Sequence, residues 1–373
     1  MQVMRLALFL VCAMGVGVGQ SVAPAQPQPP MQGRQVWEMQ DSGTNAGLRG
    51  IDSVDGTVAW ASGTGGTVLR TTDGGAHWQR CATPDAGKDG ATLDFRGVQA
   101  WDAETAFVMS SGKSRLSRLY KTIDGCMSWT TQFTNPDEDG FWDALMMDID
   151  YELFILGDPV GGRFVLFSQA PGGKWSRNWN GHDIVAQRGE VAFAASNSVL
   201  IEGGQGGFCF VTGGSKTEII HEIHGIDLDK GMFSDWVRMP LPLAVGDSAG
   251  AFSISSIQFS GGSLHNSFVV VGGDYKRPGD SIGTAAFSSD WGETWTASTI
   301  PPHGFRSAVQ WSEALKAWIT VGTNGSDISR DDGKTWQPLD DGNWNALSLP
   351  FVVGPNGRIA RLNAQSLSPA GGP

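Results

Sequence analysis

Thr71-Thr72-Asp73-Gly74-Gly75-Ala76-His77-Trp78 is the stretch that decides the fold, because close copies of it recur along the chain. Three copies keep the Asp and the Trp at the same spacing: Thr122–Trp129, Ser288–Trp295 and Ser329–Trp336. The Asp can accept hydrogen bonds from its own turn, Gly supplies the positive φ of a tight hairpin, and Trp buries a large surface between packed units. We expect a structural role for these motif residues: Asp73, Trp78, Asp124, Trp129, Asp290, Trp295, Asp331 and Trp336.

The motif belongs to a longer repeat, because a short apolar run precedes the turn in each unit and seven such runs follow one another. Arg49, Arg96 and Asp143 occupy equal places in the first three units and lie 47 residues apart. A repeat near this length with four short strands is typical of a propeller blade. We therefore predict an all-β fold, a seven-bladed β-propeller of four-stranded antiparallel blades. In this prediction Val199–Gly203 is the second strand of the fourth unit.

The last unit lacks a fourth strand, since the pattern ends after Leu362 without a turn that carries Trp. Arg34–Met39 stands unattached at the front of the chain. We expect this N-terminal strand to complete the seventh blade, which would remove the open sheet edges.

The ends of the chain differ in composition from the repeats. Residues 1–19 carry one basic residue and then an apolar run, as a secretory signal peptide does, and a Pro-rich linker follows at residues 20–34. A membrane anchor is the alternative, but the run is shorter than the roughly 20 residues that a span requires. The propeller then takes up residues 35–364, and we expect a disordered tail at residues 365–373.

Charge and cysteine content limit the possible partners and compartments. The chain has a net charge of −12, and loss of the signal removes one more positive charge. This acidic balance, in an exported protein, argues against a nucleic-acid partner. Cys81 and Cys126 lie beside successive turn motifs, so a disulfide between neighbouring blades and a pair of free thiols are both open. Cys209 alternates with two Phe residues and is expected to be a buried apolar residue.

The turn motifs, the N-terminal signal and the seven units together resemble the bacterial Asp-box (BNR) repeat propellers. Three phrases, Leu48-Arg49-Gly50-Ile51, Phe95-Arg96-Gly97-Val98 and Phe305-Arg306-Ser307-Ala308, resemble the photosystem II stability and assembly factor group. The resemblance covers roughly residues 35–364. It implies a lumenal or periplasmic protein that binds other proteins while a membrane complex is assembled. The wider superfamily also contains sialidases and other glycosidases, so the fold alone does not assign a role.

The strand order places the Asp-box motifs at one end of the blades and the starts of the first strands at the other. The first strand of a blade is the innermost, so residues at its start should ring the central channel. We expect this ring to contain Arg49, Arg96, Asp143, Arg188, Arg306 and Asn345. Loops at the same end should add Arg115, Arg118, Arg163, Tyr275, Lys276 and Arg277.

Clustered guanidinium groups in a concave mouth suit a carboxylate or another anion. The alternative is that each arginine pairs with a nearby acid, such as Asp52, Asp94 or Asp143, and fastens one blade to the next. On the first hypothesis the chain is a monomeric, periplasmic or extracellular binding protein without cofactor or metal. It would bind an acidic segment of a protein partner or a membrane complex, and it would not insert into the membrane once the signal is removed.

A sialidase-like glycoside hydrolase that uses the same mouth is the alternative function. Such an enzyme needs a Tyr nucleophile activated by Glu, together with an acidic residue as proton donor. Of the three tyrosines, only Tyr275 belongs to a loop at the expected mouth. We therefore favour a binding protein over an enzyme.

Overall fold

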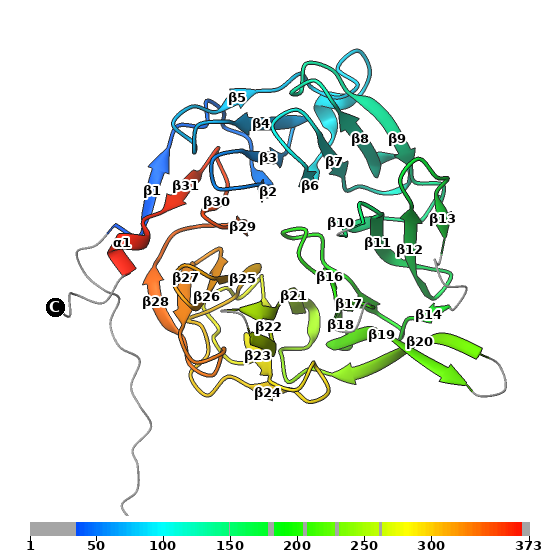
Figure 1. Ribbon diagram of the computed structural model, residues 1–373, viewed down its shortest axis with the longest axis vertical. Helices are drawn as coiled ribbons and strands as arrows, with labels where there is room; N and C mark the ends of the chain where they lie inside the picture. The colour runs from blue at the N-terminus through cyan, green and yellow to red at the C-terminus, as the bar shows by residue number, and fades with distance from the viewer. Residues whose placement is uncertain are drawn as a thin grey trace, which may run out of the picture.

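The computed structural model describes residues 35–367 except 149, 178–182, 204–206, 228–230 and 261–262. These residues form seven sheets that stand as blades around a central axis (Figure 1). Neighbouring strands within each blade pair antiparallel, and the first strand of each blade lies nearest the axis (Figure 1). The predicted seven-bladed β-propeller is therefore confirmed.

Blades 1, 2, 3 and 6 follow the chain from the axis outward. Blade 1 contains β2 (Leu48–Ser53), β3 (Ala59–Gly63), β4 (Thr67–Thr71) and β5 (Gln79–Arg80). Blade 2 contains β6 (Phe95–Ala100), β7 (Ala106–Ser110), β8 (Arg118–Thr122) and β9 (Thr130–Thr134). Blade 3 contains β10 (Trp142–Met147), β11 (Leu153–Val160), β12 (Arg163–Gln169) and β13 (Ser176–Arg177), and β14 (Ile184–Val185) also pairs with β12. Blade 6 contains β25 (Ala308–Ser312), β26 (Ala317–Gly322), β27 (Gly325–Ser329) and β28 (Gln337–Asp340).

In blade 4 the strands keep this order but β18 is skipped, and blades 5 and 7 also contain strands from other places in the chain. Blade 4 contains β16 (Leu200–Glu202), β17 (Phe208–Val211), β19 (Glu218–Asp227) and β20 (Gly231–Pro240). Blade 5 contains β21 (Gly246–Ser260), β22 (Ser263–Asp274), β23 (Ala285–Ser288) and β24 (Thr296–Ala297), and its sheet is extended by β15 (Glu190–Val191) and β18 (Gly213–Gly214). Blade 7 contains β29 (Ala346–Ser348), β30 (Phe351–Val353), β31 (Ile359–Leu362) and β1 (Trp37–Gln40).

The N-terminal strand closes the ring as predicted. β1 pairs antiparallel with β31 over all four of its residues, and the two strands lie side by side in blue and red in Figure 1. The indole Nε1 of Trp37 also donates a 3.0 Å hydrogen bond to Ser326 Oγ of blade 6. The closing strand is therefore held by the blades on both sides of the seam.

Buried apolar side chains fill the seams between neighbouring blades. Leu48 and Ile51 of blade 1, for example, pack in one cluster with Phe351 and Ile359 of blade 7. The clusters follow one another around the ring, and each joins adjacent blades. Since a fully buried side chain of this size contributes about 1.5–3 kcal/mol, the seams hold the blades together.

The Asp-box carboxylates bind their own turns. Asp73 Oδ1 accepts hydrogen bonds from the amide of His77 at 3.0 Å and the hydroxyl of Thr71 at 2.9 Å, and the other three motifs repeat the pattern. The amide of His77 lowers the pKa of Asp73 to about 2, and the hydroxyl of Ser128 lowers the pKa of Asp124 to the same value. These turns connect the third and fourth strands, so they lie at the opposite end of the blades from the starts of the first strands.

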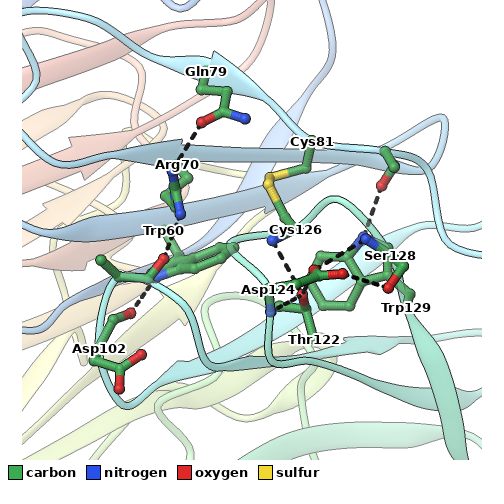
Figure 2. The surroundings of a disulfide bond; sticks show 12 residues. Trp60, Arg70, Gln79, Cys81, Asp102, Thr122, Asp124, Cys126, Ser128 and Trp129 are labelled. Carbon is green, nitrogen blue, oxygen red and sulfur yellow. Dashed lines mark hydrogen bonds between the residues drawn. A yellow bond between two sulfur atoms is a disulfide. The ribbon is translucent and has the colours of Figure 1, made fainter.

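The Asp-box tryptophans pack against the preceding blade. Trp78 of blade 1 donates a 3.0 Å hydrogen bond to Gln40 Oε1 and meets Phe351 edge to face, and both partners belong to blade 7. Trp129 of blade 2 donates to the carbonyl of Ala82 and meets Trp60 of blade 1 (Figure 2). The motif thus fixes both a hairpin and a contact between blades.

A disulfide joins Cys81 and Cys126, which decides between the two possibilities that the sequence left open (Figure 2). Cys126 lies in the Asp-box turn of blade 2 at φ +69, a backbone conformation that favours glycine. The bond therefore ties that turn to the end of blade 1, across the seam that Trp129 also crosses. Cys209 is free and buried, as expected.

Two details of the sequence prediction need correction. β16 is the innermost strand of blade 4, so Val199–Gly203 supplies its first strand and not its second. The cause is the long connection before β16, which enters the channel and forms no inner strand of its own in its described part. The described part of the chain also ends in a short helix, α1 (Ala364–Leu367), whose Leu367 is buried, so residues 365–367 belong to the folded domain.

The expected signal peptide, the expected linker and the rest of the expected tail lie outside the described residues. No helix in the described part of the chain has the length and apolar character needed to span a membrane.

Removal of the disulfide should destabilise the propeller. It closes a loop across 45 residues, for which the loss of unfolded-state entropy corresponds to roughly 2–4 kcal/mol. We expect a reductant to lower the melting temperature of the wild type and to leave a Cys81→Ala/Cys126→Ala variant, which starts lower, unchanged. A Cys209→Ala variant should respond to reductant as the wild type does. A wild-type melting temperature that is insensitive to reductant would contradict the bond.

Candidate functional site: a basic and aromatic mouth

Beta-bulges in the first strands determine which side chains face the axis. The pairing of β2 with β3 shifts register across Arg49, that of β6 with β7 across Arg96, and that of β10 with β11 across Asp143. The pairing of β21 with β22 shifts in the same way across Phe252. A bulge residue has no partner on the next strand and its side chain is redirected, which is a common device near binding sites.

Three of these side chains contribute to one cavity of about 320 Å³ at this end of the channel, which we call the axial mouth. Its lining residues come from five blades and from the connection that leads into β16. They are Arg49, Arg96, Phe193, Ala194, Ala195, Phe252, Tyr275, Phe305, Ser307, Thr323 and Asn345.

One wall of the axial mouth is basic. Arg49 Nε lies 3.2 Å from Asp94 Oδ1, and Arg96 Nε lies 2.9 Å from Asp94 Oδ2. Two guanidinium groups therefore share one carboxylate, which leaves one positive charge uncompensated by that acid. Burial lowers the pKa of Arg49, the charge of Asp94 opposes this shift and Arg96 adds to it. Both side chains stay partly exposed, at 34% and 26%, so a ligand can reach them.

The facing wall is aromatic. The rings of Phe193 and Phe252 stack in parallel at 3.9 Å, and Phe305 meets Phe252 at right angles at 4.8 Å. Tyr275 packs on the same Phe252 ring and is 44% exposed, with Lys276 Nζ 6.0 Å from its ring centre. The mouth can therefore contact an anion on one side and an apolar group on the other.

Residues 193–198, which we call the channel segment, lead into β16, and Phe193, Ala194 and Ala195 line the mouth. The connection before β16 extends toward the axis of the ring (Figure 1). Asn197 exchanges hydrogen bonds with the backbone of Leu145 in blade 3, and its Nδ2 reaches Val98 O of blade 2 at 3.5 Å. Its neighbours bond across to blades 5 and 6, through Ser198 to Ser253 and through Ser196 to the carbonyl of Ser307. The channel segment thus joins four blades across the axis.

Two carboxyl groups, the buried Asp143 and the half-buried Asp158, lie near the basic wall. Asp143 is 1% exposed, and its Oδ2 has no hydrogen-bond partner. Burial and the charge of Asp158 raise the pKa of Asp143 well above its usual range, while Arg96 acts in the opposite direction. Burial also raises the pKa of Asp158 to about 6, although the amide of Ala192 donates to it. Asp143 is therefore a buried neighbour of the mouth and does not face a ligand.

Arg306 does not face the axial mouth, contrary to expectation. It is fully buried, and its Nε donates to Asp327 Oδ2 at 2.6 Å. The side chains of His303 and Asn324 complete this network. Burial raises the pKa of Asp327, but the charge of Arg306 and the hydrogen bond from His303 outweigh it and lower the pKa overall. Arg306 therefore fits the alternative hypothesis, in which an arginine pairs with an acid of the same fold.

The physical reason is the register of blade 6. The described pairs of β25 and β26 run from Ala308 without a register shift, so Arg306 precedes the strand and is not a bulge residue. Its neighbour Phe305 lines the mouth instead.

The other expected binding residues lie around the mouth or away from it. Asn345 lines the mouth and donates to the carbonyl of Leu48. Most of the basic loop residues are already paired: Arg118 with Asp89, Arg163 with Asp183, and Arg277 with Asp274 and Asp280. Arg115 lines a separate surface hollow beside Arg118, and Arg188 is exposed in the turn before β15.

Sequence reasoning missed the three phenylalanines of the mouth. Phe252 is the bulge residue of blade 5, at the place that Arg49 and Arg96 occupy in blades 1 and 2, so its position in the repeat was the available signal. Phe305 lies before β25, next to Arg306. Phe193 belongs to the channel segment, which carries no repeat motif. Within the described residues no group of three His, Cys, Asp or Glu side chains could hold a metal ion.

Two solved structures share this fold over most of the chain. YCF48 from Cyanidioschyzon merolae has a TM-score of 0.59 at 17% identity, and the match covers 89% of this chain and 100% of that one. A structure of YCF48 bound to a D1 peptide has a TM-score of 0.58 at 16% identity, covering 92% of this chain and 99% of that one.

The resemblance to the photosystem II stability and assembly factor group is confirmed at the level of the fold. No protein-family model and no curated protein sequence matches the chain.

Loss of the Arg306 side chain should lower the stability of the fold and should not act on ligand binding directly. Removing one partner of a buried ion pair leaves the other charge uncompensated, so we expect Arg306→Ala to cost about 3–5 kcal/mol in chemical denaturation. The Arg306→Ala/Asp327→Ala double variant should lose less than the sum of the single variants. Arg188→Ala, at an exposed position, should change stability by less than about 0.5 kcal/mol. Equal, small losses for Arg306 and Arg188 would contradict the buried pair.

Asp143 should make stability depend on pH. An acid whose pKa is raised on folding keeps its proton in the folded chain at a pH where the unfolded chain has lost it. The contribution of Asp143 to the free energy of unfolding is therefore fully present below its unfolded pKa, and it is lost as the pH rises through its folded pKa. We expect Asp143→Asn to raise the free energy of unfolding more at pH 8 than at pH 5, measured by urea denaturation. The exposed Asp332→Asn is the control, and an equal effect of Asp143→Asn at both pH values would contradict the proposal.

Proposed function

We propose that this chain is an exported propeller that binds an acidic segment of a protein partner at its axial mouth. The observation that carries the proposal is the pair Arg49 and Arg96, which share Asp94 and line one cavity. A guanidinium group offers paired donors that match the two oxygens of a carboxylate. The concave mouth also concentrates the field of the uncompensated charge.

The aromatic wall favours a peptide over a free inorganic anion. Phe252, Phe305 and Tyr275 can cover an apolar side chain next to the bound carboxylate, and such rings dominate the energetics of many interfaces. Because the channel segment bonds to four blades beneath the mouth, the partner is expected to bind at the surface and not to thread through the ring.

The structural neighbours support a protein ligand, since one of them is YCF48 bound to a D1 peptide. The disulfide between Cys81 and Cys126 supports export, because such bonds persist in oxidising compartments such as the periplasm. We propose that the mature protein is monomeric there.

The glycosidase alternative finds less support. It requires a Tyr beside a Glu, with a second carboxyl group within reach of the substrate. Tyr275 lines the mouth, but the described residues that line it include no Asp or Glu. Tyr120 is buried away from the mouth, where it bonds to Asp85.

Removing both Arg49 and Arg96 should weaken the binding of acidic peptides. We propose to measure fluorescence anisotropy with labelled peptides of acidic, neutral and basic sequence, a D1 peptide among them. Since a hydrogen bond to a charged group contributes about 1.5–3 kcal/mol, Arg49→Ala/Arg96→Ala should weaken acidic peptides at least roughly tenfold. Arg188→Ala is the matched control and should bind as the wild type does. Unchanged affinity in the double variant, with its fold intact by circular dichroism, would refute the proposal.

A further inference from the structure

A second cavity, of about 490 Å³, lies at the same end of the blades, at the seam between blade 7 and blade 1. It is formed by the connection from β1 to β2, the connection from β28 to β29 and the loop between β30 and β31. These connections lie at the end where the first strands start, so the cavity shares a face with the axial mouth. We call it the outer cavity, and its polar side chains include Arg358, Asp41, Asn45, Asn343 and Asn356.

Arg358 differs from the paired arginines of this face. Its guanidinium carbon lies 4.4 Å from the ring centre of Trp344, and its Nε is buried without a hydrogen-bond partner. Among the described residues it forms no ion pair, whereas Arg118, Arg163 and Arg277 are each held by a carboxylate. This cation is therefore available to a ligand.

The support beneath Arg358 is rigid. Trp344 is fully buried, its Nε1 donates to Asp340 Oδ2, and its ring packs against that of Trp37. The loop that carries Arg358 is tied to blade 1 by hydrogen bonds from Gly357 to Ala46 and from Leu48 to Gly354. A guanidinium group held over an indole loses little freedom on binding, which favours affinity.

The two cavities meet at Trp344. Asn343, before it, lines the outer cavity, and Asn345, after it, lines the axial mouth. Residues two apart in an extended chain are separated by about 7 Å, so a single bound peptide can reach both cavities.

The chemistry of the outer cavity suits a carboxylate on a polypeptide. Arg358 would bind the carboxylate, and the side-chain amides of Asn45, Asn343 and Asn356 can donate to or accept from a peptide backbone. Asp41 also lines the cavity; its Oδ1 accepts a hydrogen bond from the amide of Gly43, and its other oxygen can accept from an N–H donor of a ligand. An inorganic anion would gain nothing from these amide acceptors or from Asp41.

We propose that the outer cavity is a second subsite for the segment held at the axial mouth, and that Arg358 selects a second carboxylate on it. The inference rests on the proposed function of the mouth. The second carboxylate can be an acidic side chain or the free carboxyl end of the segment, because both present the same two oxygens to the guanidinium group.

The test compares synthetic peptides that differ only in the second carboxylate. One set carries a single Glu with an amidated end, one carries a second Glu at increasing separation, and one carries a single Glu with a free carboxyl end. The wild type should bind the best dicarboxylate at least roughly tenfold more tightly than the monocarboxylate, the value of one charged hydrogen bond. The peptide set whose affinity rises above that of the monocarboxylate set identifies the source of the second carboxylate.

Arg358→Gln should remove that gain and leave affinity for the monocarboxylate peptide unchanged, while Arg188→Gln should alter neither. Arg49→Ala/Arg96→Ala should weaken every peptide, which separates this inference from the function of the mouth. Equal wild-type affinity for mono- and dicarboxylate peptides would overturn the second subsite and would not affect the proposed function of the axial mouth. A gain that persists in Arg358→Gln would overturn the role of Arg358. Because the wild-type comparison needs no variant, the inference remains testable even if Arg358→Gln misfolds.

Discussion

Closure of the ring is the constraint on which the other features of this molecule depend. β1 pairs with β31 along its whole length, so blade 7 is assembled from the two ends of the described chain and β31 is not left as an unpaired edge. The hydrogen bond from Trp37 to Ser326 and the buried clusters between blades then hold the first strands around one axis. Only in this arrangement can residues as distant in sequence as Arg49 and Asn345 line the same cavity.

Within that ring, the register of the first strand decides what each blade offers. Leu48 and Phe95 enter the buried seams, and the bulges turn the next residue, Arg49 or Arg96, toward the opening. Blade 6 has a similar phrase, yet its Phe305 faces the opening and Arg306 is buried with Asp327. Side chains alternate between the two faces of a strand. A change of one residue in register therefore exchanges the side chain that faces the opening with the one that is buried. The bulges are therefore the local feature that gives a structural repeat a cavity lined by basic and aromatic side chains.

This explains how far the sequence alone could reach. The spacing of the Asp boxes predicts the blades, and the unattached segment at Arg34–Met39 predicts the closing strand, because both follow from turn chemistry and the need to satisfy sheet edges. Arg49 and Arg96 were found by their equal positions in successive units. The same rule assigns Arg306 to the mouth, and no residue type in its phrase marks the shift of one residue that places Arg306 where Leu48 lies in blade 1. The channel segment was not foreseen because it follows no repeat period, and Arg358 was missed because the prediction followed first strands.

The charge of the mouth has to be considered against the charge of the whole chain, which is −12. An acidic ligand is repelled by such a body at long range, although salt at physiological strength screens that repulsion beyond about 8 Å. Attraction must therefore act at contact, in partly buried sites where screening is weaker. Arg49 and Arg96 meet this condition because they share Asp94, and because the raised pKa of Asp143 limits the negative charge beneath them. For the proposed acidic ligand, specificity would consequently depend on the geometry of a few short contacts and not on steering by the overall field of the chain.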